Sequence, residues 1–338
     1  MVQGLEADET SAPDQSTEPS RATRPWVRTL SLVVYAVLLG VWTKFLGIPN
    51  DTVQVFLWLW FATVMWHIEA PRGYHLRFLR DWWLPVVGLV VYFYSRGLTD
   101  ELGLPVHYTM PIRFDEWLVS LFGGPDGVLP TQLLQERLCG EPCERTSHPR
   151  WYDVLLTTVY ASHFLVGLTL AAVLWIRDRA AWLRWMRRYV IINFGALVVY
   201  IVYPMSPPWM ASELGFVDAT LPRITGRGWS DLGLGRFDLV LQGVGNPVAA
   251  MPSLHAGIAG LVAMYGIWRL RSPFRWLLAL YPLAMGLALV YYAEHYVIDL
   301  LAGWLLAGAV MVGCGLWERR RAAAVSTRVS APTTSPRG

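Results

Sequence analysis

Hydrophobic residues in this chain gather in eight long runs separated by polar segments. A transmembrane helix needs about 17–25 predominantly apolar residues to cross the hydrocarbon core of a bilayer. The runs cover residues 29–48, 52–69, 82–98, 152–175, 188–204, 254–268, 276–293 and 296–317. Pro85 interrupts the third run and the sixth run is short, so the boundaries of these two are the least defined. The pattern predicts eight membrane-spanning helices.

The composition agrees with a polytopic membrane protein. The 338 residues are 54% hydrophobic and only 16% charged, whereas a soluble domain carries about 25% charged residues. The mean hydropathy is +0.36, and the 18 Trp, 15 Tyr and 12 Phe suit bilayer interfaces. These values exclude a soluble enzyme, a disordered protein and a disulfide-rich secreted module. We therefore predict an all-α fold, a polytopic integral membrane helical bundle.

Polar segments divide the chain into five parts. Residues 1–28 are predicted to form a disordered cytoplasmic tail, because Ser, Thr, Pro, Asp and Glu predominate there. Residues 29–98 hold the N-terminal transmembrane helices, 99–150 form an outer loop, 151–317 form a second group of spans, and 318–338 form a disordered cytoplasmic tail. The first run starts too late and is too long for a cleavable signal peptide.

Arginines orient the predicted spans, since Lys44 is the only lysine in the chain. They cluster in both tails and in alternate connections, within residues 72–80, 177–188 and 269–275. The positive-inside rule places these segments and both termini in the cytoplasm. Segments 99–150 and 205–250 then lie outside, where a membrane enzyme can build a substrate entrance. We expect a multi-pass protein of the plasma membrane.

Cysteine usage and net charge add little to the functional interpretation of the sequence. Cys139 and Cys143 lie four residues apart in the first outer segment. They can form a disulfide in an oxidising compartment if the backbone turns there, and two free thiols are an equally good interpretation. The net charge is only +3, and the chain has no Arg-rich helix or aromatic RNA-binding pattern, so no nucleic-acid partner is predicted.

Two polar motifs in the second half of the chain carry the candidate chemistry. His295 and Asp299 are one helical turn apart, so the carboxylate can accept the proton of one ring nitrogen and leave the other as a nucleophile. His255 follows Pro252 and Ser253 in the first turn of the sixth run. The start of a helix suits a phosphate group, and His255 can protonate a leaving oxygen as a general acid.

A phosphoryl group also needs positive charge or several hydrogen-bond donors around its oxygens. Five residues are candidates for substrate binding: the Ser253 hydroxyl, the Asn246 amide, and the outer-loop arginines Arg223, Arg227 and Arg236. The Asn-Pro pair at Asn246 is equally a turn signal, and each arginine can instead be an exposed charge. Glu294 beside the nucleophile is interpreted as outward-facing or acceptor-binding. No metal-ligand spacing is present, so neither a metal nor a cofactor is predicted.

These motifs resemble a known family. Pro252-Ser253-Leu254-His255 and His295-Tyr296-Val297-Ile298-Asp299 are similar to the second and third signature motifs of the type 2 phosphatidic acid phosphatase (PAP2) superfamily. The resemblance covers about residues 150–317. It implies a six-helix membrane core that cleaves lipid phosphate esters through a phosphohistidine without metal. It also implies that His295 is the nucleophile, Asp299 its orienting partner and His255 the general acid.

The sequence departs from the family pattern at two places. The third motif usually begins with Ser-Arg, where this chain has Ala288 and Leu289. The first motif, a Lys followed at a distance by Arg-Pro, is absent. In its place stands Tyr203-Pro204-Met205-Ser206-Pro207-Pro208-Trp209-Met210. This element resembles the branch that contains inositol phosphorylceramide synthase and related phospholipid-headgroup transferases.

Two functions follow from these observations. The first is a membrane enzyme that acts on a lipid phosphate or phospholipid at the outer face, either as a phosphatase, with water as acceptor, or as an inositolphosphotransferase-like enzyme, with an alcohol as acceptor. The second is a non-enzymatic membrane transporter of a lipid or small solute, because buried His and Asp residues can relay protons. An internal repeat would favour the transporter, and none is visible in the sequence.

Overall fold

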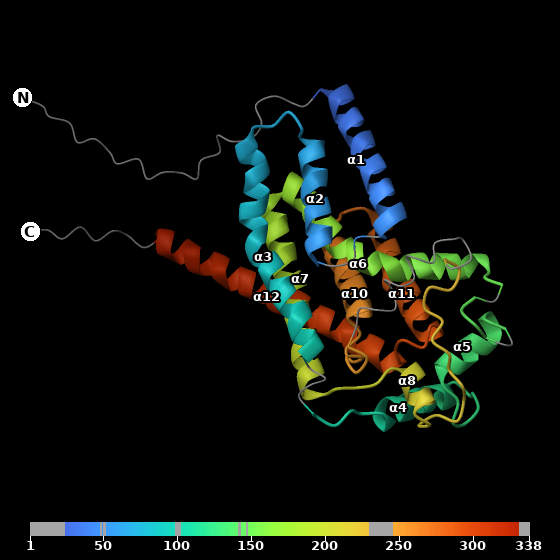
Figure 1. Cartoon of the computed structure of the whole chain (residues 1–338). Helices are drawn as coiled ribbons and strands as arrows, with labels where there is room; N and C mark the ends of the chain where they lie inside the picture. The colour runs from blue at the N-terminus through green and yellow to red at the C-terminus, as the bar shows by residue number, and fades with distance from the viewer. Residues whose placement is uncertain are drawn as a thin grey trace, which may run out of the picture.

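The computed structural model describes residues 24–330, apart from 48, 50–51, 99–102, 141–142, 147 and 230–245. The described chain is almost entirely helical, so the all-α prediction is confirmed. Each predicted span corresponds to a helix. They are α1 (Pro25–Leu46), α2 (Thr52–Trp66), α3 (Arg72–Leu98), α6 (Trp151–Arg177), α7 (Arg179–Val202), α10 (Leu254–Arg269), the 3₁₀ helix η3 (Pro273–Ala279) continued by α11 (Leu280–Tyr291), and α12 (Val297–Ser330) (Figure 1).

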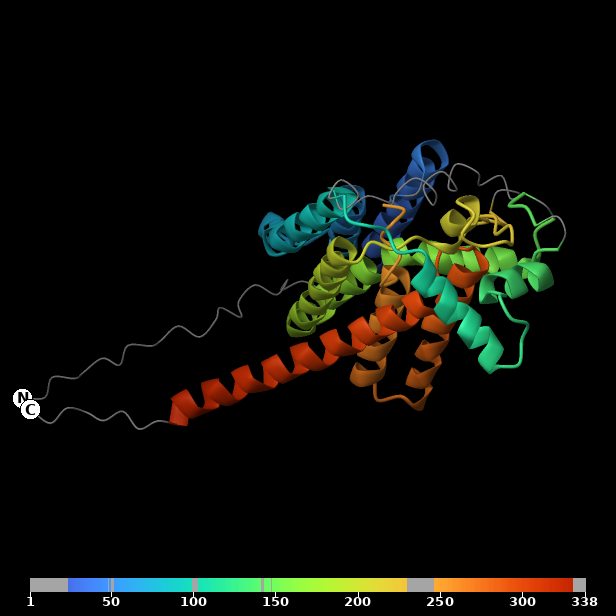
Figure 2. The same cartoon turned by 90° about the horizontal axis from the view of Figure 1, so that it is seen from below.

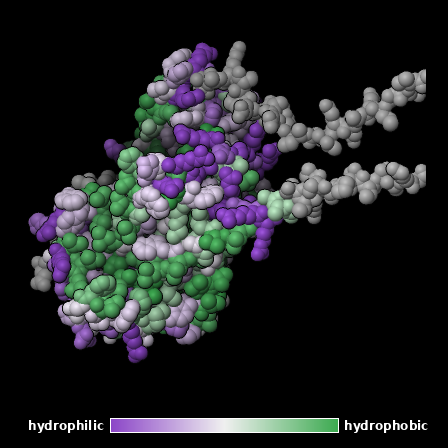
Figure 3. All heavy atoms as spheres, turned by 180° about the vertical axis from the view of Figure 1, so that it is seen from behind, coloured by the Kyte–Doolittle hydropathy of each residue, from purple (hydrophilic) through white to green (hydrophobic). Residues whose placement is uncertain are grey.

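Five of these segments are long and apolar enough to cross a membrane: Pro25–Leu46, Trp151–Arg177, Arg179–Val202, Pro273–Tyr291 and Val297–Ala324. The surface agrees with a lipid environment. Large apolar side chains such as Tyr94 and Leu305 are 70% and 73% exposed, and Figure 3 shows a broad apolar face bordered by hydrophilic side chains. Because a water-soluble surface would not expose so much apolar area, the protein is a multi-pass membrane protein.

Helix packing places α10 at the centre of the second half of the chain, in contact with α6, α7, α11 and α12. The N-terminal helices join this bundle through contacts of α2 with α6 and of α3 with α7. Aromatic side chains fill the contact between α3 and α7. The Phe78 and Trp82 rings of α3 stack with centroids 4.7 Å apart, and Trp82 lies 5.8 Å from Trp182 of α7. The N-terminal helices therefore pack closely on the second group of spans.

Short helices gather at one end of the bundle, which we call the site end. They are α4 (Thr109–Leu121), α5 (Pro130–Leu138) and α8 (Pro208–Glu213) (Figures 1 and 2). Both predicted outer loops thus contain helices, because their apolar residues can bury against the bundle; Ile112, Leu129 and Ala211 share one hydrophobic cluster. The structure also joins Cys139 and Cys143 in a disulfide, one of the two arrangements that the sequence allowed.

The ends of the helical region differ from the sequence prediction. Helix α1 begins at Pro25, before the predicted start at 29, since proline suits the first turn of a helix; residues 1–23 of the predicted tail lie outside the described residues. Helix α12 continues to Ser330 and projects beyond the other helices (Figure 2). The predicted tail at 318–338 is therefore helical as far as 330. Arg187 and Arg188 of α7 hold Glu318 at 2.6 and 2.8 Å, which anchors this extension.

Glycines allow α10 and α12 to approach backbone to backbone. A Cβ atom at Gly303 would lie 2.4 Å from the Ser253 carbonyl oxygen and 3.1 Å from the Gly257 amide nitrogen. A Cβ atom at Gly257 would lie 3.2 Å from the Gly303 carbonyl oxygen. Any larger side chain at Gly303 would push apart the beginnings of the two helices that carry the candidate histidine motifs.

We expect Gly303→Ala to destabilise the protein by about 1–3 kcal/mol, the usual cost of overpacking a close contact. Thermal unfolding in detergent measures the change. The matched control is Gly308→Ala in the same helix, where an added Cβ meets no atom within 4 Å and alanine improves helix propensity. Equal melting temperatures for the two variants would contradict a required close approach at Gly303.

Candidate active site

The two predicted histidines line one cavity at the site end of the bundle. The cavity has a volume of about 210 Å³, and its wall combines polar and aromatic side chains from both halves of the chain. The polar and aromatic lining residues are Arg96, Tyr160, His163, Phe164, Tyr200, Trp209, Arg223, Asn246, His255, Glu294 and His295. The ring centroids of His255 and His295 lie 6.1 Å apart. One small ligand can therefore contact both imidazoles.

Asp299 holds the His295 ring by a side-chain contact. The Asp299 Oδ2 atom lies 3.2 Å from His295 Nδ1 and also accepts a hydrogen bond from the Tyr296 amide at 3.0 Å. Both residues are buried, with Asp299 completely inaccessible. A carboxylate at Nδ1 favours the tautomer with its proton on that nitrogen, which leaves the lone pair on Nε2.

Asp299 also connects the two histidine segments through its backbone. Its carbonyl oxygen accepts a hydrogen bond from the Ser253 amide at 2.9 Å. Ser253 is the N-cap of α10, and its hydroxyl accepts from the Ala256 amide at 3.3 Å. Ser253 is fully buried, and its side chain serves the start of the helix that carries His255. A direct contact between the Ser253 hydroxyl and a phosphate stays a prediction.

His255 lies between aromatic rings from α6. Its ring stacks on Tyr160, with centroids 4.9 Å apart and an interplanar angle of 18°, and the His163 ring lies 3.9 Å away on α6. The His255 Nε2 atom has no hydrogen-bond partner among the described residues. His163 also lines the cavity, because the packing of α6 on α10 brings it there.

The environment of His295 favours a neutral imidazole. Burial lowers the pKa of His295 to about 4; the Arg96 charge acts in the same direction, and Glu294 opposes it. His295 lies in the turn between the Pro273–Tyr291 and Val297–Ala324 segments. At neutral pH its ring therefore carries a lone pair and can act as a nucleophile.

Glu294 and Arg223 form an ion pair in the cavity wall. The guanidinium of Arg223 donates to both carboxylate oxygens of Glu294, at 2.8 and 3.2 Å, and lies 5.2 Å from the centroid of the Trp209 ring. The Thr225 hydroxyl also donates to Glu294. Arg223 thus lines the cavity, and its contact with a phosphate stays a prediction. Glu294 faces the cavity and not outward, because Arg223 and Thr225 hold its carboxylate there.

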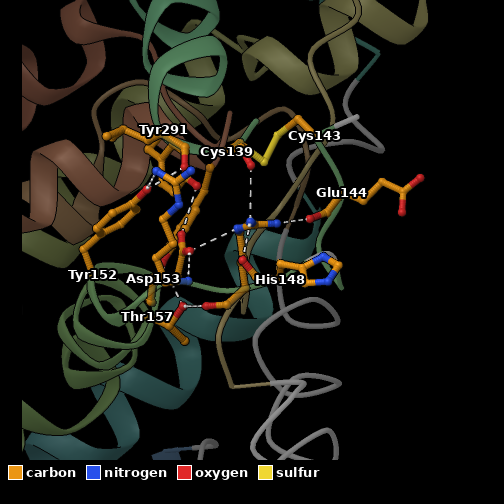
Figure 4. Close-up of polar contacts among 12 residues, drawn as sticks. Cys139, Cys143, Glu144, His148, Tyr152, Asp153, Thr157 and Tyr291 are labelled. Atoms are coloured by element: carbon orange, nitrogen blue, oxygen red, sulfur yellow. Dashed lines mark hydrogen bonds and ion pairs between the residues drawn. A yellow bond between two sulfur atoms is a disulfide. The ribbon is translucent and has the colours of Figure 1, made fainter. Parts of the chain in front are cut away.

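Arg227 has neither of the positions that the sequence left open, because it is not exposed and does not line the cavity with the histidines. It is buried away from the cavity and pairs with Asp153 of α6 at 3.2 Å, and it donates to the backbone carbonyls of Glu144, Cys139 and His148 (Figure 4). Its own carbonyl accepts from Thr157 at 2.6 Å. This network ties the segment with the disulfide to α6. A buried charge needs such partners, so Arg227 is a structural residue here.

The other predicted phosphate ligands divide between the cavity and the undescribed part of the chain. Asn246 lines the cavity and donates to the Arg96 carbonyl at 3.1 Å, while its side-chain oxygen accepts from the Val248 amide at 2.8 Å. Its turn and site interpretations are therefore compatible. Arg236 lies outside the described residues. Within the described residues, no three His, Cys, Asp or Glu side chains form a group that can hold a metal ion.

Arg96 is a cavity residue that the sequence analysis did not identify. It lies near the end of α3, in the N-terminal part of the chain, and lines the cavity beside the histidines. One signal was available in the sequence: Arg96 is a charged residue at the outer end of a predicted span. Intramembrane and interfacial charges of this kind are functional candidates by default.

Comparison with known proteins identifies relatives of this chain. A sequence profile of the PAP2 superfamily matches residues 141–313. The chain is 31% identical over 197 residues to a phosphoinositol dihydroceramide synthase of Bacteroides thetaiotaomicron, covering 54% of this chain and 60% of that protein. It is 33% identical over 132 residues to the inositol phosphorylceramide synthase catalytic subunit of Schizosaccharomyces pombe, covering 36% and 30%.

A third relative, an inositol phosphorylceramide synthase of Candida albicans, is 26% identical over 166 residues, which cover 46% of this chain and 34% of that protein. The chain thus matches less than two thirds of the length of each of these relatives. No solved structure matches significantly. The profile spans just over half of the chain and includes both histidine motifs, and the chain belongs to the PAP2 superfamily.

Proposed function

We propose that this protein is a membrane phosphotransferase that moves a phosphate-linked headgroup from a phospholipid to a lipid alcohol at the outer face of the membrane. The observation that carries the proposal is that His255 and His295 line one cavity, with Asp299 on the far side of the His295 ring. The similarity to a phosphoinositol dihydroceramide synthase and an inositol phosphorylceramide synthase supports a phosphoinositol headgroup and a ceramide-type acceptor.

In the first step, His295 Nε2 attacks the phosphorus of the donor lipid. The bond between phosphorus and the diacylglycerol oxygen breaks, and His255 protonates that departing oxygen as a general acid. The Asp299 carboxylate stabilises the positive charge that develops on the His295 ring. The headgroup phosphate is then held covalently on His295, and diacylglycerol leaves into the bilayer.

In the second step, the acceptor hydroxyl attacks the phosphorus while His255, now neutral, removes the hydroxyl proton. The phosphorus–nitrogen bond breaks and His295 returns to its starting state. Attack by water in place of the alcohol would give hydrolysis with the same three residues. The cavity wall contains the aromatic rings of Tyr160, Phe164 and Trp209, which favour an amphiphilic acceptor over free water.

Two arginines in the cavity wall support phosphate binding. Arg96 comes from α3 and Arg223 from the segment between α8 and α10, and both line the same cavity as the histidines. Charge gathers on the phosphoryl oxygens during transfer, so these two cations replace the arginine that this chain lacks at the third signature motif. Asn246 adds an amide beside Arg96. We place this site outside, with both termini in the cytoplasm of a plasma-membrane protein.

We expect His295→Ala to abolish headgroup transfer and His255→Ala to lower it by about 10²–10⁴-fold, the range for loss of a general acid–base. Purified full-length protein in lipid vesicles, given phosphatidylinositol and a fluorescent ceramide, tests both. The control is His75→Ala, because His75 does not line the cavity. It lies in α3 about 31 Å along the helix from the cavity residue Arg96. Full transfer by the His295 variant would reject the assigned nucleophile, and absence of transfer by the wild-type protein would leave a transporter as the better function.

A second prediction concerns the covalent intermediate. Donor lipid carrying radiolabelled phosphorus, supplied without acceptor, should label the wild-type protein but not His295→Ala. Phosphorus on a histidine nitrogen is labile in acid and stable in base, so acid treatment should release the label. An adduct that is stable in acid and released by base would instead identify a serine or carboxylate ester and contradict the mechanism.

The third prediction tests the contribution of α3. Arg96→Met should reduce kcat/KM by about 10- to 100-fold, since hydrogen bonds to charged groups contribute about 1.5–3 kcal/mol. Arg96→Lys should recover part of the loss because it keeps the charge without the planar donor pair. Arg80→Met, on the same helix with a 76% exposed side chain, should keep wild-type kinetics. Unchanged kinetics in Arg96→Met would show that phosphate binding does not use α3.

A further inference from the structure

A completely buried carboxylate reaches the beginning of α12 from outside the region that matches the PAP2 superfamily. Asp115 belongs to α4 and has no exposed surface. Its two carboxylate oxygens lie 3.1 and 3.0 Å from the amide nitrogen of Val297, the first residue of α12. Val297 follows the proposed nucleophile by only two positions, so this contact fixes the chain immediately after His295.

The start of α12, where the Asp115 side chain lies, favours a negatively charged group. The first amides of a helix lack partners within the helix, and together they form the positive end of its dipole. Asp115 faces the first two amides of α12, those of Val297 and Ile298. Asp299 lies in the same first turn and orients the His295 ring. A movement of this turn would displace the ring and its orienting carboxylate together.

The charge of Asp115 is sensitive to pH near neutrality. Burial raises the pKa of Asp115 to about 7; the Asp299 charge acts in the same direction, and the Val297 and Ile298 amides oppose both. The titratable groups that act on it within the described chain are Asp299 in α12 and Tyr296 in the preceding turn. As the pH falls through 7, Asp115 gains a proton and loses the charge that complements the helix dipole.

We propose that Asp115 is a positioning residue that holds the His295–Asp299 turn in its reactive place when ionised and loosens it when protonated. The inference rests on the proposed function for its kinetic consequence, but the movement of His295 does not depend on catalysis. Helix α4 thus supports the active site from outside the matched region.

The test compares Asp115→Asn with the control Asp126→Asn, which alters an exposed carboxylate in the turn after α4. Wild type and the control should gain about three- to tenfold in transfer rate between pH 6 and 8. Asp115→Asn should stay at the acid-side rate throughout, because an amide cannot ionise. A profile that rises with pH in Asp115→Asn as it does in wild type would overturn the inference.

A second readout needs no activity. Mass spectrometry can follow the carbethoxylation of His295 by diethyl pyrocarbonate between pH 6 and 8. In wild type, the labelling of His295 should become slower relative to that of a free imidazole as the pH rises, because ionised Asp115 holds the turn in place. In Asp115→Asn this slowing should disappear. The same pH dependence of His295 labelling in both proteins would overturn the proposal even if transfer were absent, and absent transfer alone would reject only the proposed function.

Val297→Pro provides an independent variant. Proline is well tolerated at the first position of a helix, and it removes the N–H group that donates a hydrogen bond to Asp115. If Asp115 acts through this amide, Asp115→Asn and Val297→Pro should each lower the rate at pH 8, and the double variant should lose no more than the stronger single one. Multiplicative losses in the double variant would mean that Asp115 acts elsewhere.

Discussion

The hydrogen bonds of Asp299 hold the site together. Its carboxylate contacts His295 Nδ1, and its backbone carbonyl accepts from Ser253, which caps the helix of His255. One buried residue therefore positions both imidazoles relative to each other. The contact requires α10 and α12 to approach closely, and the glycine at 303 permits this because any Cβ atom there would collide with the Ser253 carbonyl.

Residues outside the PAP2-matched region complete the site around this centre. Arg96 enters the cavity from α3, and Asp115 of α4 holds the first amide of α12. Buried charges in a membrane protein are costly unless they are paired. Here the pairs have separate uses: Arg227 with Asp153 secures the disulfide-bearing segment to α6, whereas Arg223 with Glu294 places charge in the cavity wall.

Much of the architecture could be predicted from hydropathy. Each of the eight apolar runs is a helix, because a chain in a bilayer must satisfy its backbone hydrogen bonds internally. The two histidine motifs were equally visible, since His295 and Asp299 lie one turn apart in sequence. The helices within the outer segments and the extension of α12 to Ser330 were missed, because their stability comes from contacts with distant residues such as the pairing of Glu318 with α7.

The sequence alone determined that the protein is a helical membrane protein with a histidine–aspartate pair and a second histidine at the start of a helix, because these features depend on composition and local spacing. Only the tertiary structure decided which distant charges share the cavity. Arg223 and Arg227 are four residues apart and look alike in the sequence, yet one lines the cavity and the other is buried beside α6. Such a division depends on packing between segments far apart in the chain, which no local pattern encodes.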